Sequence, residues 1–405
     1  MFTFVKIAWR NILRNKQRSF ISVTAIAVGL GALILIRAFT EGMDRQMIEN
    51  YTDLVISHIQ IHKKGFHQKM GLERSIERTE DLVDNLLAER SVIAFTERVK
   101  KTVLISSPEQ ASGALLIGID PSAEYKVTKL HKKIRIGEKL SNEDDEGIIV
   151  GREYLDILNV SLGEKIVITA QDVKGELVAG AFRIRGVIDT GSEEIDKGIV
   201  VITLKQAQEL FGLGRSVSEI AIKVDNVYGS DSIRDRLNQR VDTGVYEVLS
   251  WKEISPMTAE WLEFDRTFID GILLIVMIII FTIIFNIILM GVFERVREFG
   301  IMLALGTKRR EIVLIVALES CLLGMVGVLL GLLAGVSISG LLGQVGINVG
   351  LMTETFYIGS IVYPRLYPDY VLRFSLQIFF ICVLVSIYPA WKAANIKPVE
   401  TVRYI

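Results

Sequence analysis

The sequence is poor in the residues on which many catalytic and metal sites rely. Its 405 residues include two cysteines, Cys321 and Cys382, and four histidines. Both cysteines lie in strongly apolar runs, where they serve either as small hydrophobic side chains or as a disulfide or metal pair. Residues 43–266 contain no cysteine, so we expect that segment to be stabilised by its own core.

Two common enzyme motifs are also missing. The sequence has no G-x-x-x-x-G-K-[ST] phosphate loop, which excludes ATP hydrolysis by the P-loop route, and no serine or cysteine in a nucleophile elbow. On a strand, His58 and His62 would share one face with Gln60, either as a plain polar face or as a metal pair. We therefore predict no catalytic and no metal-binding residues, and a chain that is not an enzyme.

The sequence has no excess of either positive or negative charge. The 46 basic and 47 acidic side chains give a net charge of -1, so composition gives no argument for nucleic-acid binding. Yet 50% of the residues are hydrophobic and the mean hydropathy is +0.40, which is too apolar for an average soluble protein. With 23% charged residues, the chain is expected to combine membrane and aqueous parts.

Four long apolar runs account for this hydropathy. They lie near 20–39, 269–293, 312–342 and 370–390. Because about 20 apolar residues cross the ~30 Å hydrocarbon core, each run predicts a transmembrane helix. In the third run, Gly327, Gly331 and Gly335 recur at a spacing of four, which favours close helix packing in lipid.

The third run also contains an acidic residue, Glu319. An ionisable group two turns inside a span is costly against lipid. We expect Glu319 to face the protein interior and to pair with a basic or polar group near the cytoplasmic side.

Basic residues predict the orientation, since Lys and Arg near membrane ends are retained in the cytoplasm. They gather in the N-terminal arm (Lys6, Arg10, Arg14, Lys16, Arg18), in the loop after the second run (Arg295, Arg297, Lys308, Arg309, Arg310) and in the tail (Lys392, Lys397, Arg403). Both termini are therefore expected in the cytoplasm.

The predicted fold class is an α-helical membrane protein of four transmembrane helices with an inserted mixed α/β periplasmic domain. The expected segments are a cytoplasmic amphipathic arm (1–19), a first helix (20–42), the α/β domain (43–266), a second helix (267–293), a cytoplasmic coupling segment (294–311), a third helix (312–342), a short periplasmic loop (343–369), a fourth helix (370–390) and a cytoplasmic tail (391–405). Residues 171–180 are expected to form a short hairpin turn.

The segment ERVREFGIMLALGTKRREI (294–312) has a helical pattern of its own. Val296, Phe299, Met302 and Leu303 fall at helical spacing, and Gly306 suits the left-handed position that ends a helix. Such a helix either docks a cytoplasmic partner or lies on the bilayer surface. Composition alone does not decide between the two.

Three segments carry a family resemblance: AWRNILRNKQRSF (8–20), the 294–312 segment and YPAWKAANIKPVETVR (388–403). Together they resemble permeases of the lipoprotein-releasing (Lol-type), MacB and FtsX superfamily of ABC transporters. The strand HIQIHKKGF (58–66) and the segment EGIIVGREYLDILNVSLGEKIVI (146–168) look most like Lol-type members. MacB is similar in its membrane part but carries a fused ATPase, and FtsX has a shorter outside domain.

The resemblance implies a non-catalytic permease that transmits the work of ATP hydrolysis to the periplasm. Its partners would be two copies of an ABC ATPase subunit, a second permease, identical or homologous, a lipoprotein cargo and a periplasmic lipoprotein chaperone. ATP and Mg would bind the ATPase, and this chain would bind no cofactor. The alternatives are a MacB-like efflux permease for drugs or peptides and an FtsX-like activator of a periplasmic hydrolase.

Two sets of residues follow from this resemblance. The ATPase-coupling set comprises Glu294, Arg297, Glu298, Phe299, Met302, Leu303 and Gly306. The cargo lipid is expected in an apolar cavity where the first two helices leave the membrane, lined by Ile36, Phe39, Met43, Met47, Phe264 and Phe268. The competing interpretation of the second set is ordinary anchoring at the membrane interface.

Overall fold

The computed structural model describes residues 2–144, 146–191, 193–350 and 361–395, which separate into two compact units. One is a helical bundle formed by residues 2–44, 263–348 and 361–395; the other is an α/β domain, mainly residues 45–262. The predicted loop 343–369 and tail 391–405, including Lys397 and Arg403, fall partly outside the described residues.

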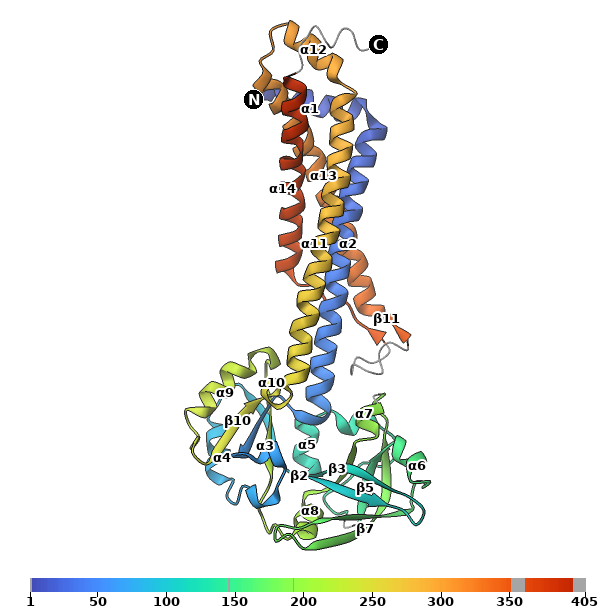
Figure 1. Ribbon diagram of the computed structural model, residues 1–405, viewed down its shortest axis with the longest axis vertical. Coiled ribbons are helices and arrows are strands. Elements are labelled where there is room, and N and C mark those ends of the chain that lie inside the picture. The colour runs from blue at the N-terminus through green and yellow to red at the C-terminus, as the bar shows by residue number, and fades with distance from the viewer. Residues whose placement is uncertain (1, 145, 192, 351–360, 396–405) are drawn as a thin grey trace. The chain divides into compact units, whose positions relative to one another are not determined.

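Within the described ranges, four helices are long and apolar enough to cross a membrane. They are α2 (Lys16–Tyr51), α11 (Pro256–Phe293), α13 (Arg309–Val345) and α14 (Pro368–Ala394) (Figure 1). The predicted class of a four-helix membrane protein with an inserted α/β domain is confirmed. The short strands β11 (Ile347–Asn348) and β12 (Ile361–Val362) pair beyond the end of α13.

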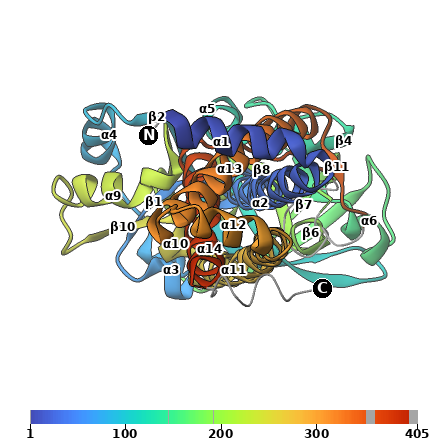
Figure 2. The same cartoon turned by 90° about the horizontal axis from the view of Figure 1, so that it is seen from above.

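A short amphipathic helix, α1 (Phe2–Arg14), precedes α2. Figure 2, which looks along the bundle, shows α1 lying across the long helices instead of along them. Its side chains Trp9 and Leu13 are exposed, and Arg10 and Arg14 are exposed as well. An exposed helix surface with both apolar and basic residues is typical of the membrane interface.

Glycines bring α13 against α2, as their spacing predicts. A Cβ atom on Gly331 would lie 2.8 Å from the carbonyl oxygen of Ala27, and one on Gly335 would lie 3.1 Å from the Cβ atom of Ile34. Backbone contact of this kind leaves no space for a side chain. The packing places Ile34 in the core of the bundle, fully buried.

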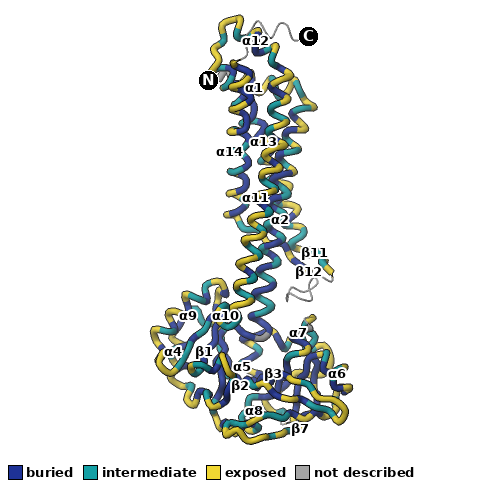
Figure 3. The backbone as a smooth tube through the Cα atoms, in the orientation of Figure 1, coloured by how far each residue is buried: buried dark blue, intermediate teal, exposed yellow. Residues whose placement is uncertain are grey.

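The helix α11 is the least covered of the four. Only 17% of the residues in its most apolar window are buried, compared with 39% to 44% in the other three helices. Exposed residues recur along its length (Figure 3). Since its mean hydropathy there is also the highest, at 3.3, this helix presents a lipid-like surface to whatever surrounds the bundle.

The α/β domain is built on one ten-stranded sheet with the order β10-β1-β9-β2-β3-β8-β5-β7-β4, with β6 paired to β2 and β7. The strands are β1 (Ile59–Lys63), β2 (Val92–Ser106), β3 (Ala111–Ile119), β4 (Ile134–Gly137), β5 (Gly147–Gly151), β6 (Lys165–Gln171), β7 (Leu177–Ile188), β8 (Ile199–Thr203), β9 (Glu219–Val224) and β10 (Tyr246–Ser250). The predicted hairpin turn forms between β6 and β7, where Gln171 pairs with Leu177.

Two of the apolar cores along this sheet share the long strand β2. The first packs β1, β9 and β10 against α4 (Glu80–Leu87) and α9 (Ser230–Asn238); the second packs β3 and β5 to β8 against α6 (Glu153–Ile157) and α8 (Leu204–Phe211). The remaining helical turns are η1 (Thr52–Ile56), α3 (Phe66–Lys69), η2 (Leu72–Arg74), α5 (Pro121–Val127), η3 (Leu130–Lys133), α7 (Glu193–Asp196), η4 (Val227–Gly229) and α10 (Trp251–Ile254).

Candidate functional site: a coupling helix and two charge networks

The predicted amphipathic segment forms a separate helix, α12 (Val296–Ala304), two residues after α11 ends. Gly306 follows with φ +97°, a conformation that a residue with a side chain rarely adopts. Its N–H donates to the carbonyl of Leu303 at 3.1 Å, which closes the helix end. The connections on both sides of α12 are short, residues 294–295 before it and 305–308 after it.

The inner face of α12 packs on the bundle. Phe299 is 1% exposed and belongs to a cluster with Val292 and Ile312, against which Met302 and Leu303 also pack. These three members of the predicted coupling set therefore anchor the helix in this structure. Their pattern gives the amphipathic face correctly, but that face points to the bundle.

The outer face of α12 presents different residues. Ile301 is 54% exposed and Leu305 is 82% exposed, and neither belongs to the predicted coupling set. Glu294, Arg297 and Gly306, which do belong to it, are also exposed. An apolar pair rimmed by charges is the kind of surface that a protein partner covers.

Glu319 lies beneath α12 and is 6% exposed. Its Oε1 atom accepts from Arg18 Nη2 at 2.6 Å, and its Oε2 atom accepts from Arg295 Nη1 at 2.8 Å. Glu319 is thus protein-facing and doubly paired, the placement expected of a carboxylate inside a span. The two arginines come from α2 and from the α11–α12 connection, so one carboxylate joins three parts of the bundle.

The network continues to the surface of α12 through Glu298. Arg295 Nε donates to Glu298 Oε2 at 2.8 Å, and Arg14, at the end of α1, also pairs with Glu298. Of the coupling set, Glu298 is therefore the residue that links α12 to the N-terminal arm. Sequence reasoning missed Arg18 and Arg295 as partners of Glu319, since neither is near it in the chain.

The predicted lipid-cavity residues do not form one accessible surface in this structure. Phe264 and Phe268 are exposed and stack with ring centroids 6.3 Å apart on α11. Ile36, Phe39 and Met43 are half-buried on α2, whereas Met47 is 4% exposed. Met47 lies in the last part of α2, which belongs to the α/β domain, and it is buried there.

Ion pairs hold α2 to α11 near this end of the bundle. Arg37 pairs with Asp270 at 3.2 Å and with Glu41 at 2.8 Å, and Arg266 pairs with Asp44 at 3.0 Å. The Asp44 side chain is buried. Motion of α2 along α11 must break or exchange the Arg37–Asp270 and Arg266–Asp44 pairs.

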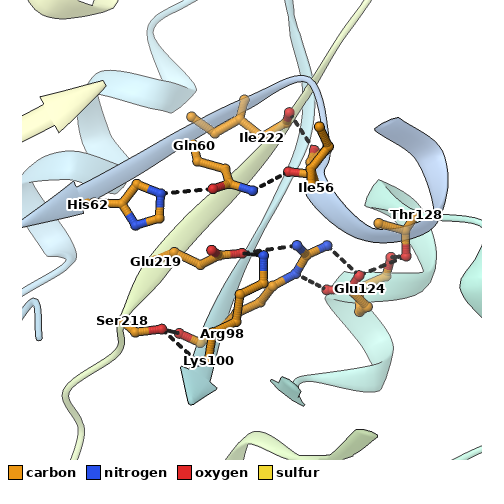
Figure 4. Close-up of polar contacts among 11 residues, drawn as sticks. Ile56, Gln60, His62, Arg98, Lys100, Glu124, Thr128, Ser218, Glu219 and Ile222 are labelled. Atoms are coloured by element: carbon orange, nitrogen blue, oxygen red, sulfur yellow. Dashed lines mark hydrogen bonds and ion pairs between the residues drawn. The ribbon is translucent and has the colours of Figure 1, made fainter. Parts of the chain in front are cut away.

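A second charge network is buried in the α/β domain (Figure 4). Arg98, on β2, donates to both carboxylate oxygens of Glu124 at 2.6 and 2.8 Å and to Glu219 at 3.0 Å. Lys100 pairs with the same Glu219 oxygen at 2.9 Å. The two cations and two carboxylates balance, which is what charges this deeply buried require.

The network shifts the protonation of its members. Burial alone would raise the pKa of Glu219, but Lys100 and Arg98 outweigh burial and lower this pKa to about 2. His62 lies beside the network on β1, where its Nε2 atom and Gln60 Oε1 are 2.8 Å apart. Burial lowers the pKa of His62 to about 4. Both groups therefore make the folded domain sensitive to acid.

We expect the α/β domain to lose about 2 kcal/mol of stability between pH 7 and pH 5 through His62. The unfolded chain takes up a proton below about pH 6.5, whereas the folded chain resists it until about pH 4, so stability falls with pH in this window. Hydrogen exchange of peptides from β1 and β9 in the full chain measures the change.

His62→Gln is expected to flatten that pH dependence, since glutamine does not titrate. An unchanged slope in His62→Gln would exclude His62 as the group that titrates.

The histidines predicted as a possible metal pair have protein partners. His58 Nδ1 accepts from the backbone N–H of Val224 at 3.2 Å, and its Nε2 atom lies 3.7 Å from Asp53. Asp53 also pairs with Lys129 and Lys223, and these partners hold the pKa of Asp53 well below its usual range against the effect of burial. Across the described residues, no three His, Cys, Asp or Glu side chains gather in a way that could hold a metal ion.

Comparison with known proteins matches both units. The model of the MacB-like periplasmic core domain matches residues 19–240, and the model of the FtsX-like permease C-terminal region matches residues 271–398. The lipoprotein-releasing system transmembrane protein LolC of Xylella fastidiosa (strain Temecula1) is 24% identical over 97% of each chain. The macrolide export ATP-binding/permease protein MacB of Chlorobium luteolum is 26% identical over 99% of this chain and 60% of its own length.

A solved structure, the extracellular domain of the ABC-type transporter YknZ from Gram-positive bacteria, aligns at 17% identity with a TM-score of 0.34, over 48% of this chain and all of that one. The family models carry the assignment, since the first of them alone spans more than half of the chain. Both family models match this chain, which also has four long apolar helices. This chain therefore belongs to the ABC permease superfamily of the Lol-type, MacB-like and FtsX-like proteins.

Proposed function

We propose that this chain is the non-catalytic permease subunit of an ABC transporter that extracts lipoproteins from the inner membrane. The observation that carries the proposal is the match to LolC, which covers 97% of both chains and so includes the bundle and the α/β domain together. Membership of the superfamily implies an ATPase partner and a second permease-type subunit. ATP and Mg would bind that ATPase, and this chain would bind no cofactor.

MacB-like export is the second candidate. The similarity to MacB extends over 99% of this chain, and the α/β domain matches the MacB-like core model. MacB is longer, however, and this chain spans 60% of it. An FtsX-like role as activator of a periplasmic hydrolase is the third, and it has in its favour the match of residues 271–398.

The proposed topology places both termini and α12 in the cytoplasm and the α/β domain in the periplasm. It rests on the basic residues at the α1 and α12 end of the bundle, among them Arg14, Arg18 and Arg295. The ATPase would then meet the outer face of α12, while cargo would be handled at the other end of α2 and α11.

We assign the direct ATPase contacts to Ile301 and Leu305, with Glu294, Arg297 and Gly306 around them. Phe299, Met302, Leu303 and Glu298 would transmit force, because they join α12 to the bundle. Leu305→Asp is expected to weaken ATPase binding at least tenfold, since it places an unpaired charge at the centre of the contact. Copurification and titration of the ATPase in detergent measure this.

Leu87→Asp is the matched control, because Leu87 is 71% exposed at the end of α4 in the α/β domain. It should leave ATPase binding unchanged. Wild-type binding by Leu305→Asp would remove the docking role from this face.

Release of a triacylated lipoprotein from proteoliposomes into the soluble fraction, on addition of ATP, tests the function itself. A photocrosslinker at Phe268 should capture the lipoprotein, whereas one at Phe380, equally exposed on α14, should not. Capture by photocrosslinkers at Phe39 and Met43 as well would show that the lipoprotein also contacts α2. Release of a macrolide or peptide without lipoprotein release would favour the MacB-like function.

A further inference from the structure

An open cleft of about 780 Å³ lies where α1 turns into α2 and where α11 ends. Its polar part contains the cations Arg14, Lys16, Arg18 and Arg295. Its apolar wall is made by Ile21, Ile287 and Met290. The cleft therefore straddles the boundary between the apolar and the charged residues of the bundle, the depth at which phospholipid headgroups lie.

The charges in the cleft are unequal. Four cations face two lining carboxylates, Glu294 and Glu298, and Glu319 behind them neutralises one cation more. Three of the four cations are engaged by these carboxylates: Arg18 and Arg295 by Glu319, and Arg14 by Glu298. Lys16 is exposed and makes no ion pair in the part of the chain that the structure describes. One positive charge is thus left for a ligand, beside the amide side chains of Asn15, Gln17 and Asn286.

An apolar path leads away from this polar pocket along α11. Met290 lines the cleft and is 65% exposed, and Ile283 and Ile279 continue the same helical face, also exposed. On α2, Ile21 and Val28 lie two turns apart and are exposed as well. Positions spaced by three, four or seven residues share one side of a helix, so these side chains form a strip long enough for an acyl chain.

We propose that this cleft binds an anionic phospholipid by its headgroup, with Lys16 and the neighbouring amides on the phosphate and the acyl chains on the exposed strip of α11. Basic pockets between transmembrane helices hold such headgroups by charge and hydrogen bonding. The single uncompensated charge matches one phosphodiester, as in phosphatidylglycerol. The choice of the cytoplasmic leaflet rests on the proposed topology, whereas the site itself does not depend on the proposed function.

Such a lipid would lie against Arg14, Arg18 and Arg295, the same side chains that join α1, α2 and α12 through Glu298 and Glu319. A phosphate near them would strengthen the hold of the arm on the bundle by adding a further anion to Glu298 and Glu319. The lipid would therefore stabilise the attachment of α12 to the bundle. How firmly α12 is attached would then depend on the lipid composition of the membrane.

Native mass spectrometry of the purified full chain, with dioleoylphosphatidylglycerol or dioleoylphosphatidylcholine added to the detergent, tests this proposal. We expect discrete binding of one phosphatidylglycerol, stronger than that of phosphatidylcholine. Lys16→Ala should weaken it about fivefold, the effect of about 1 kcal/mol for one basic residue. Lys6→Ala, which removes the same charge from α1 outside the cleft, should change it little.

A second variant, Met290→Trp, fills the apolar wall without changing charge and should also reduce binding. Glycerol 3-phosphate, added as a soluble phosphate source, should not compete at equal concentration, because it lacks the chains. Competition by glycerol 3-phosphate would show that the cleft binds a soluble phosphate compound and not a lipid. Equal losses in Lys6→Ala and Lys16→Ala, or equal binding of both lipids, would overturn the proposal by reducing it to general attraction to an anionic surface.

Discussion

Arg98→Met is expected to destabilise the α/β domain by about 3–5 kcal/mol, because it leaves the buried carboxylates Glu124 and Glu219 with one cation between them. Arg98 is 1% exposed and donates to both. Hydrogen exchange in increasing urea, read on peptides from β2 and β9 of the full chain, reports the loss.

The double variant Arg98→Met with Glu124→Leu separates charge imbalance from lost packing. It leaves Lys100 and Glu219 as a neutral pair, whose atoms are 2.9 Å apart. If the imbalance causes the effect, the double variant should be more stable than Arg98→Met, although it carries one substitution more. A double variant that is less stable than the single one would show that the hydrogen bonds of Arg98, and not its charge, hold the domain together.

The same residues explain where sequence reasoning stopped. The long strand β2 runs from Val92 to Ser106. Arg98 and Lys100 occupy buried positions in the first part of β2. In the sequence alone, charged residues at these positions would suggest a surface loop. Only the tertiary partners Glu124 and Glu219, from α5 and β9, make these positions acceptable. A pattern confined to one segment does not contain that information.

The membrane part is the more predictable one, since lipid imposes length and hydropathy on each helix separately. The four helices and the glycine contacts of α13 follow directly from these local rules. For α12, spacing gives the apolar face but not its direction, because Phe299 would suit either a partner or the bundle. Exposure of Ile301 and Leu305 decides this, and exposure depends on α13 and α14.

Glu319 shows the same limit within the bundle. An acidic residue in an apolar run predicts burial and a basic partner, and Glu319 has both. Arg18 lies 301 residues away in the chain, and Arg295 lies 24 residues away on the other side of α12. No spacing rule connects them, so the three-way junction of α2, α12 and α13 emerges only from the fold.

We expect Glu319→Gln to uncouple ATP hydrolysis from transport while the ATPase still binds. Glutamine keeps the shape but removes the carboxylate that lies between the half-buried Arg18 and the buried Arg295. Breaking a buried pair in this way costs about 3–5 kcal/mol. The repulsion should release Arg295, and with it α12, from α13, so that force applied to Leu305 no longer reaches the bundle.

Three measurements decide this prediction together: ATPase binding, ATP hydrolysis in the assembled complex, and protection of α12 against hydrogen exchange. Glu260→Gln is the matched control, because Glu260 is exposed on α11, at the end of this helix away from α12. It should change each readout slightly. Unaltered α12 protection and transport in Glu319→Gln would mean that the Glu319 carboxylate is not needed to transmit force from α12 to the bundle.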